Sequence, residues 1–190
     1  MKNICIIGSG SWGSALSIHA AQMGHNVKLW SHSKEEADLI NEEHRCKFLP
    51  NASMEKNIIC TSDIEEAIKG SDVVFHVTPS KFTRETVEKY KDFIDDQPII
   101  LCSKGFESST LYTLNEVVEE EIPNAQIGVL TGPSHAEEVS LGIPTVVLIA
   151  SENEEVQKLV QDSLMDEKLR IYTSYDVKGA ELGGALKNII

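Results

Sequence analysis

The chain has 190 residues, of which 41% are hydrophobic and 25% charged. This composition is typical of a globular protein and excludes a disordered, collagen-like or coiled-coil chain. Seventeen Lys and Arg against thirty Asp and Glu give a formal net charge of −13, which repels nucleic acids and anionic membranes at long range. No apolar run approaches the ~18 residues of a membrane span, and Gly8 interrupts the N-terminus too early for a signal peptide. We therefore expect a soluble, cytoplasmic protein that binds no nucleic acid and inserts into no membrane.

Short apolar runs alternate with longer amphipathic ones along the chain. The predicted strands are residues 3–7, 26–30, 58–61, 72–77, 98–102, 125–130, 144–150 and 169–173. The predicted helices are residues 13–23, 34–43, 63–69, 80–94, 110–121, 134–141, 152–164 and 176–190, with a loop over 44–56. Strands that alternate with helices indicate βαβ units. The fold class is therefore α/β, a Rossmann-type, doubly wound, mostly parallel sheet formed by residues 1–175.

The last predicted helix has an apolar stripe of Leu182, Leu186, Ile189 and Ile190, and no capping glycine or proline follows it. This pattern predicts that residues 176–190 begin a helical second domain that is missing here, so that the natural chain continues. The alternative is an apolar C-terminal helix docked on its own domain.

The four cysteines are Cys5, Cys46, Cys60 and Cys102. They form no CxxC pair, no histidine stands at metal-ligand spacing, and three lie in or beside apolar strands. The sequence therefore predicts buried, reduced thiols and no metal site.

A glycine-rich run, GSGSWG from Gly8 to Gly13, follows the first strand and opens a helix. In the G-x-G-x-x-G pattern, Gly8 makes the tight turn, Gly10 lets a pyrophosphate approach the backbone, and Gly13 lets the helix pack against the sheet. The N–H groups at the start of the helix then face the phosphates. The run predicts a dinucleotide site; the alternative is a glycine-rich turn that binds nothing.

The residues after the second strand bear on the choice of dinucleotide. NAD-specific sites usually place an acid there, about 20 residues after the loop, to bind the ribose 2′-hydroxyl. Here the stretch has no acid before Glu35 and nothing that repels a 2′-phosphate, and it offers Ser31, His32, Ser33 and Lys34. This favours NADP, or use of both NADP and NAD. The alternative is a solvated loop whose polarity carries no meaning.

Three further motifs lie in the second half, SKGFE at 103–107, GPSHAEEV at 132–139 and ELGGALKN at 181–188. Lys104 follows one predicted strand, and Gly132 and Ser134 follow the next, at the edge where open α/β sheets bind ligands. Ser134 is expected to start a helix whose N–H groups face an anionic ligand.

Lys187 lies on the last helix, above Gly183 and Gly184, with Ala180 one turn lower. That face has almost no side-chain bulk, so a ligand can approach the backbone there. The alternative is an ordinary surface lysine.

Together with the glycine loop, these motifs resemble the bacterial NAD(P)-dependent glycerol-3-phosphate dehydrogenases over essentially the whole chain, in the same order. That family has an N-terminal Rossmann domain and a C-terminal helical domain. The resemblance implies reversible reduction of dihydroxyacetone phosphate to sn-glycerol 3-phosphate with NADP or NAD as cofactor, for glycerophospholipid synthesis. It is compatible with a homodimer.

The resemblance also implies roles for individual residues. Lys187 matches the acid–base residue, and His32 stands where relatives often carry Arg. The cofactor-binding residues it implies are Gly8, Gly10, Ser11, Trp12, Gly13, His32, Ser33, Lys104 and Ala136. The substrate-binding residues it implies are Lys104, Gly132, Ser134 and Lys187. The residues that grip the substrate phosphate belong to the second domain, so we expect the 190-residue chain alone to be inactive.

Two other functions stay open on the sequence. One is a related two-domain dehydrogenase that acts on a hydroxy acid, although Gly132-Pro133-Ser134 followed by Ala136-Glu137-Glu138 favours the glycerol-3-phosphate family. The other is a dinucleotide-binding redox sensor without catalysis, which would not need Lys104, Ser134 and Lys187 near one another.

Overall fold

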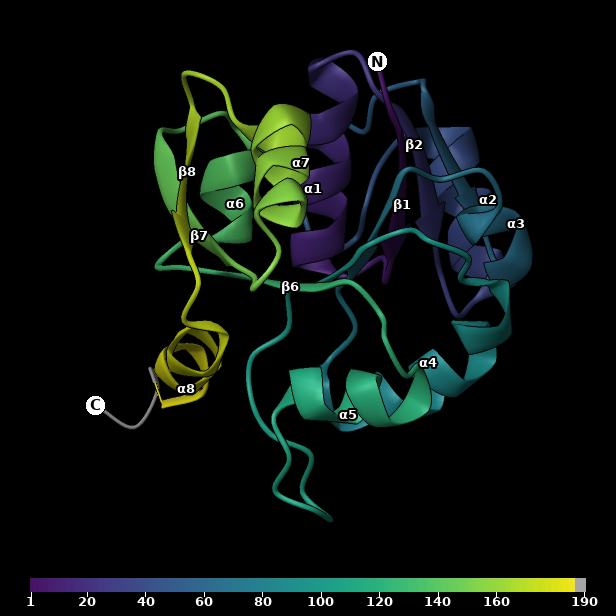
Figure 1. Ribbon diagram of the computed structural model, residues 1–190. Coiled ribbons are helices and arrows are strands. Elements are labelled where there is room, and N and C mark those ends of the chain that lie inside the picture. The colour runs from purple at the N-terminus through teal and green to yellow at the C-terminus, as the bar shows by residue number, and fades with distance from the viewer. Residues whose placement is uncertain (187–190) are drawn as a thin grey trace.

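The computed structural model describes residues 1–186, in which eight strands form one sheet in the order β3-β2-β1-β4-β5-β6-β7-β8 (Figure 1). All neighbouring strands are parallel except the pair β6 and β7, which is antiparallel. The strands are β1 (Asn3–Ile7), β2 (Asn26–Trp30), β3 (Ile58–Thr61), β4 (Val73–His76), β5 (Ile99–Leu101), β6 (Ile127–Thr131), β7 (Thr145–Ala150) and β8 (Leu169–Ser174). The predicted doubly wound, mostly parallel sheet is confirmed.

Helices cover both faces of the sheet (Figure 1). Those on one face are α1 (Ser11–Gln22), α2 (Lys34–Glu43), α6 (Ala136–Ser140) and α7 (Glu154–Leu164). Those on the other face are α3 (Ile64–Ile68), α4 (Thr83–Tyr90), α5 (Leu114–Glu121) and α8 (Val177–Leu186). The winding direction reverses between β1 and β4, so the carboxyl ends of these two strands form the switch point at which such sheets bind ligands.

The central strands are mostly apolar because both of their faces are covered. In β1, Ile4 and Ile6 belong to the apolar core under α1, whereas Cys5 and Ile7 belong to the core on the opposite face. This is the two-residue period of a strand, with each face buried against a helix layer. All four cysteines are buried free thiols, as predicted.

Side-chain caps explain where several helices begin. Ser33, Asp63, Thr113 and Asn153 each accept a hydrogen bond from a backbone N–H in the first turn of the following helix. At Thr113 the cap is reciprocal, because the Glu116 side chain also accepts from the Thr113 backbone N–H.

Several predicted helix bounds differ from those of the structure. Helix α5 begins at Leu114 rather than at 110, because Leu111 has a φ of 62° and Thr113 is the N-cap. The helix predicted over 80–94 is divided into η1 (Ser80–Phe82), α4 and η2 (Lys91–Phe93). Helix α6 begins at Ala136 with His135 as its N-cap, so Ser134 lies before the helix and does not start it.

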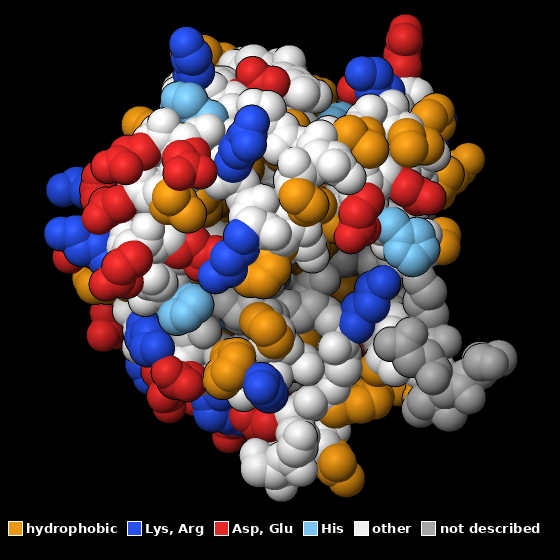
Figure 2. Space-filling view, turned by 180° about the vertical axis from the view of Figure 1, so that it is seen from behind, with side chains coloured by type: hydrophobic (Ala, Val, Ile, Leu, Met, Phe, Trp, Pro, Cys, Tyr) orange, Lys and Arg blue, Asp and Glu red, His pale blue; other side chains and the backbone are white. Residues whose placement is uncertain are grey.

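Helix α8 contributes Ala180 to the core on the face of α3, α4 and α5. The division at residue 175 and the second, helical domain stay predictions, and Lys187 lies outside the described residues. No helix within residues 1–186 is long and apolar enough to cross a membrane. On the face shown in Figure 2, the described acidic and basic side chains are interspersed.

A histidine is buried at the carboxyl end of β4. The two ring nitrogens of His76 lie 2.7 Å from Thr78 Oγ1 and 3.2 Å from the Tyr90 hydroxyl, so both are hydrogen-bonded. Burial lowers the pKa of His76 from 6.5 to about 4, because a charged imidazole loses its hydration there. The folded protein therefore holds this histidine neutral.

This burial predicts a pH dependence of stability. Between pH 6.5 and 4 the unfolded chain binds a proton at His76 that the folded chain does not, so the free energy of unfolding should fall as the pH falls, by about 3 kcal/mol in total. In His76→Gln this part of the acid sensitivity should disappear. Urea unfolding at a series of pH values measures it, with the exposed His135→Gln as the matched control. An unchanged slope in His76→Gln would contradict the assignment.

Candidate cofactor and substrate site

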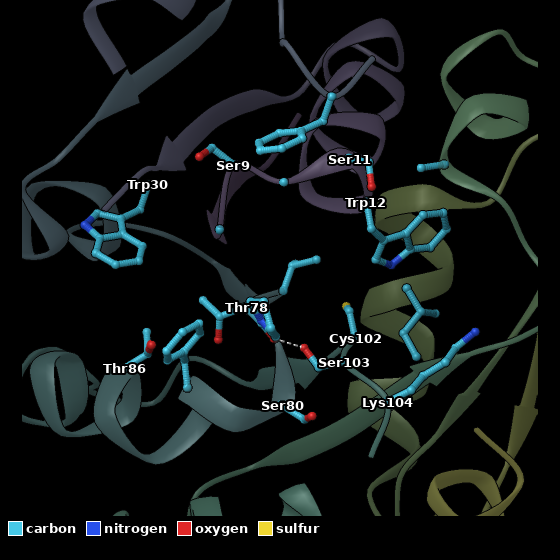
Figure 3. Close-up of a pocket in the computed structure, with 18 of the residues that line it drawn as sticks. Ser9, Ser11, Trp12, Trp30, Thr78, Ser80, Thr86, Cys102, Ser103 and Lys104 are labelled. Carbon is cyan, nitrogen blue, oxygen red and sulfur yellow. Dashed lines mark hydrogen bonds between the residues drawn. The ribbon is translucent and has the colours of Figure 1, made fainter. Parts of the chain in front are cut away.

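A cavity of about 870 Å³ opens at the carboxyl ends of the parallel strands. Its walls are formed by the segments that follow β1, β2, β4, β5 and β6, together with parts of α2, α4 and α6. The lining residues include Gly8, Ser9, Gly10, Ser11, Trp12, Trp30, His32, Glu36, Phe48, Thr78, Ser80, Thr86, Cys102, Ser103, Lys104, Gly132, Ser134 and Ala136. In Figure 3, Ser9 and Trp30 lie on one side of this space and Trp12 and Lys104 on the other. Most residues predicted from the sequence are therefore brought together.

The glycine loop has three distinct local constraints. Gly8 has a φ of +124°, which L side chains rarely adopt. A Cβ on Gly13 would overlap the carbonyl oxygen of Gly8, so only glycine lets α1 pack this close to β1. A Cβ on Gly10 would meet no atom within 4 Å, because it would point into open space. Gly10 is thus bare on the side that a ligand can use.

The end of β2 differs from the expectation. The carboxylate of Glu36, from the first turn of α2, lines the cavity and accepts hydrogen bonds from Ser9 and Ser31. The prediction that nothing here repels a 2′-phosphate considered only the residues before Glu35, and it stays a prediction. Ser33 caps α2, donates to Glu35 Oε2 at 2.8 Å, and is not among the lining residues. The exposed His32 does line the cavity.

The floor of the cavity contains residues that the sequence did not single out. Ser103 Oγ donates a hydrogen bond to the backbone carbonyl of Thr78, the dashed line in Figure 3. Thr78 is in turn hydrogen-bonded to the buried ring of His76. The available signal was the position of Thr78 just beyond the buried strand β4, beside the switch point of the sheet.

The opposite wall carries the residues assigned to the substrate. The Lys104 ammonium donates a hydrogen bond to the Gly132 carbonyl oxygen at 3.0 Å, which joins the segments after β5 and β6. A Cβ on Gly132 would lie 2.9 Å from the Val146 carbonyl oxygen, and one on Gly184 would lie 2.9 Å from Thr131 Oγ1. Both glycines thus allow close packing, of β6 against β7 and of α8 against β6. Among the described residues no group of histidine, cysteine or acidic side chains could hold a metal ion.

An open parallel sheet with a glycine loop at its switch point defines the class of Rossmann-type dinucleotide-binding domains. A family model for the NAD-dependent glycerol-3-phosphate dehydrogenase N-terminus matches residues 3–157. The chain belongs to this family.

Relatives agree with this assignment over the whole chain. It is 45% identical to a glycerol-3-phosphate dehydrogenase [NAD(P)+] of Agathobacter rectalis, covering 100% of this chain and 57% of the relative. It is also 45% identical to the glycerol-3-phosphate dehydrogenase [NAD(P)+] of Bacillus velezensis, covering 100% of this chain and 56% of that relative. The crystal structure of glycerol-3-phosphate dehydrogenase from Coxiella burnetii superposes with a TM-score of 0.94 at 33% identity, over 99% of this chain and 58% of that one. The chain thus spans somewhat more than half the length of these relatives.

Two glycine substitutions should separate ligand binding from folding. Gly10→Val should weaken dinucleotide binding by about 100-fold or more, because the side chain would fill the space that a pyrophosphate needs, and it should leave the melting temperature unchanged. Gly13→Ala should instead destabilise the fold by roughly 1–3 kcal/mol, because its Cβ overlaps Gly8. Quenching of Trp12 and Trp30 fluorescence by NADH or NADPH reports binding. Unchanged affinity in Gly10→Val would show that the loop is only structural.

Proposed function

We propose that this chain is the cofactor-binding part of a glycerol-3-phosphate dehydrogenase that reversibly reduces dihydroxyacetone phosphate to sn-glycerol 3-phosphate with NADH or NADPH. The observation that carries the proposal is the convergence, in one cavity, of the glycine loop after β1, Lys104 after β5, and Gly132 and Ser134 after β6. Three chain segments far apart in sequence thus bring residues for the cofactor and for the substrate into one cavity.

The residues present fit a dinucleotide. Gly10 leaves open space above the start of α1, and the N–H groups of the first turn of that twelve-residue helix lie beside the same space. Trp12 and Ala136 supply apolar surface beside the loop. When bound, NAD(P)H supplies the hydride. The loop from Gly8 to Gly13 would hold the pyrophosphate through backbone groups.

Lys104 and Lys187 are the cations that we assign to the substrate. Lys104, held by its hydrogen bond to the Gly132 carbonyl, would polarise the ketone oxygen. Lys187 would donate a proton to that oxygen as the carbonyl carbon accepts the hydride, and would take the same proton back in the reverse reaction. A lysine needs a pKa lowered toward neutrality for this role. Ser134 would orient the substrate.

The same proposal places the protein in the cytoplasm, in glycerophospholipid synthesis, with a small-molecule substrate rather than a nucleic acid. The homodimer stays a prediction. The reaction class is tested with the whole gene product, by monitoring the loss of NADH or NADPH absorbance as the cofactor is oxidised. Turnover with dihydroxyacetone phosphate supports the proposal, turnover only with a 2-keto acid supports a hydroxy-acid dehydrogenase, and tight binding without any turnover supports a redox sensor.

The role of Lys187 can be tested by two substitutions in the whole gene product. Lys187→Ala should lower kcat by about 10²–10⁴-fold, the usual contribution of proton transfer, with little change in dinucleotide affinity. Lys187→Arg should not restore the rate, because a guanidinium stays protonated. If Lys187 only anchors the substrate, arginine would recover much of the rate, and the loss in alanine would appear mainly in KM. Steady-state kinetics with separately measured binding distinguishes these outcomes.

A further inference from the structure

The segment that carries Lys104 begins where the backbone ladder between β4 and β5 ends. A bond from the Cys102 N–H to the carbonyl of His76, the last residue of β4, completes this ladder. The Ser103 hydroxyl then donates to the Thr78 carbonyl, the dashed line in Figure 3. A side chain thus joins the two segments one step beyond the sheet, at the residue that directly precedes Lys104.

The residue on the other side of Lys104 packs against the same segment. Gly105 has a φ of +130°, and a Cβ on it would lie 2.9 Å from Ser80 Oγ and 3.3 Å from Ser80 Cβ. The positive φ and the close approach both favour glycine at this position. Residues 103 and 105 are therefore both held against residues 78–80, so the backbone of Lys104 is constrained from either side.

The residue that accepts the Ser103 hydrogen bond is itself held by buried groups. Thr78 Oγ1 lies 2.7 Å from His76 Nε2, and the Tyr90 hydroxyl lies 3.2 Å from His76 Nδ1. His76 and Tyr90 are both 0% exposed, so water does not compete for these bonds. A buried polar network whose members are satisfied by one another is rigid. Thr78 is therefore a fixed point to which Ser103 is tied.

The Lys104 side chain reaches from this backbone to the neighbouring wall of the cavity. Its ammonium donates to the Gly132 carbonyl oxygen at 3.0 Å, and a Cβ on Gly184 of α8 would lie 3.5 Å from Lys104 Cγ. The stem therefore passes close to α8 between the segments that follow β5 and β6. A lysine has a long, flexible stem, so the place of its ammonium depends on where its backbone is held.

We infer that Ser103 is a positioning residue, whose hydrogen bond to Thr78 sets the place of the Lys104 ammonium in the cavity. The inference rests on the role of Lys104 that we propose above. A cation that polarises a ketone oxygen acts only at the right distance and angle, so the groups that hold it contribute to the rate without touching the substrate.

Arg84 is the competing anchor of the same segment. Its guanidinium lies 2.7 Å from Glu107 Oε1, but Glu107 is three residues beyond Lys104. A bond on the residue directly before Lys104 constrains the Lys104 backbone more than a bond three residues away. The geometry therefore favours Ser103 as the residue that sets the ammonium.

The first test measures turnover of dihydroxyacetone phosphate by the whole gene product. Ser103→Ala should lower kcat by about 10–100-fold, because a small displacement of the Lys104 ammonium weakens its action in the transition state. KM should change less than kcat. Ser103→Thr keeps a hydroxyl and should retain most of the rate.

Ser151→Ala is the matched control. It also removes a serine hydroxyl that donates to a backbone carbonyl, that of Ile127 at 2.7 Å. Ile127 is the first residue of β6, so this bond lies at the end of the sheet away from the cavity. The substitution should leave kcat within about twofold, because the two sites share no partner.

A double substitution separates positioning from a loss of stability. In a Lys104→Met background, Ser103→Ala should lower kcat by no more than about twofold, because the residue through which it acts is already gone. If Ser103 only stabilises the fold, it should cost the same factor with and without Lys104.

The second test follows Lys104 in the chain without any reaction at the site. The chain is treated with acetic anhydride, and acetylation of Lys104 is measured by mass spectrometry relative to the exposed Lys158. Ser103→Ala should raise the relative rate about threefold or more, because a hydrogen bond from the ammonium to a carbonyl favours its protonated, unreactive form. Ser151→Ala should leave the rate unchanged.

Three results would overturn the inference. These are an unchanged acetylation rate of Lys104 in Ser103→Ala, an unchanged kcat in Ser103→Ala, and an equal loss of kcat in the Lys104→Met background. If the unaltered whole gene product does not turn over dihydroxyacetone phosphate, the proposed function itself fails. Faster acetylation in Ser103→Ala alone would still support Ser103 as the residue that positions Lys104.

Discussion

The close approach of α1 to β1 is the constraint on which the site depends. Gly13 lies so near the Gly8 carbonyl that any side chain would overlap it, and Ser17 Oγ donates to the Gly13 carbonyl oxygen at 2.8 Å within the first turns of the helix. This packing fixes the direction of α1 and leaves Gly10 facing the cavity. The N–H groups at the start of the helix then face the space between β1 and β4. The anion site is therefore a consequence of how one helix packs against one strand.

The opposite wall depends on longer-range contacts. The segment after Lys104 is anchored by Arg84, whose guanidinium lies 2.7 Å from carboxylate oxygens of Glu107, Glu120 and Glu121. Hydrogen bonds from Arg84 lower the pKa of Glu107 to about 2. Arginine suits this role because its planar fork can bind several carboxylates at once. The loop that carries Lys104 is thereby tied to both α4 and α5.

The sequence was informative where local patterns decide the structure. Apolar runs predicted every strand, and amphipathic runs predicted where the helices lie, because these features depend on neighbouring residues. The start of α5 was missed because it follows a left-handed Leu111, which no local pattern indicates. Glu36 was missed for a different reason. Its orientation depends on Ser9 and Ser31, which lie 27 and 5 residues away along the chain, so spacing alone could not place its carboxylate.

A net charge of −13 also has a consequence for how this chain can bind a polyanion. The field of the whole protein opposes the approach of a dinucleotide, and the glycine loop contains no cation to offset it. Binding must then depend on backbone N–H groups held in place by α1, on the shape of the cavity and on nearby cations such as Lys104, which lines it. Such short-range contacts with fixed dipoles depend less on ionic strength than surface charges do. In this setting the buried Glu36 carboxylate beside the loop is tolerable because the hydroxyls of Ser9 and Ser31 donate hydrogen bonds to it.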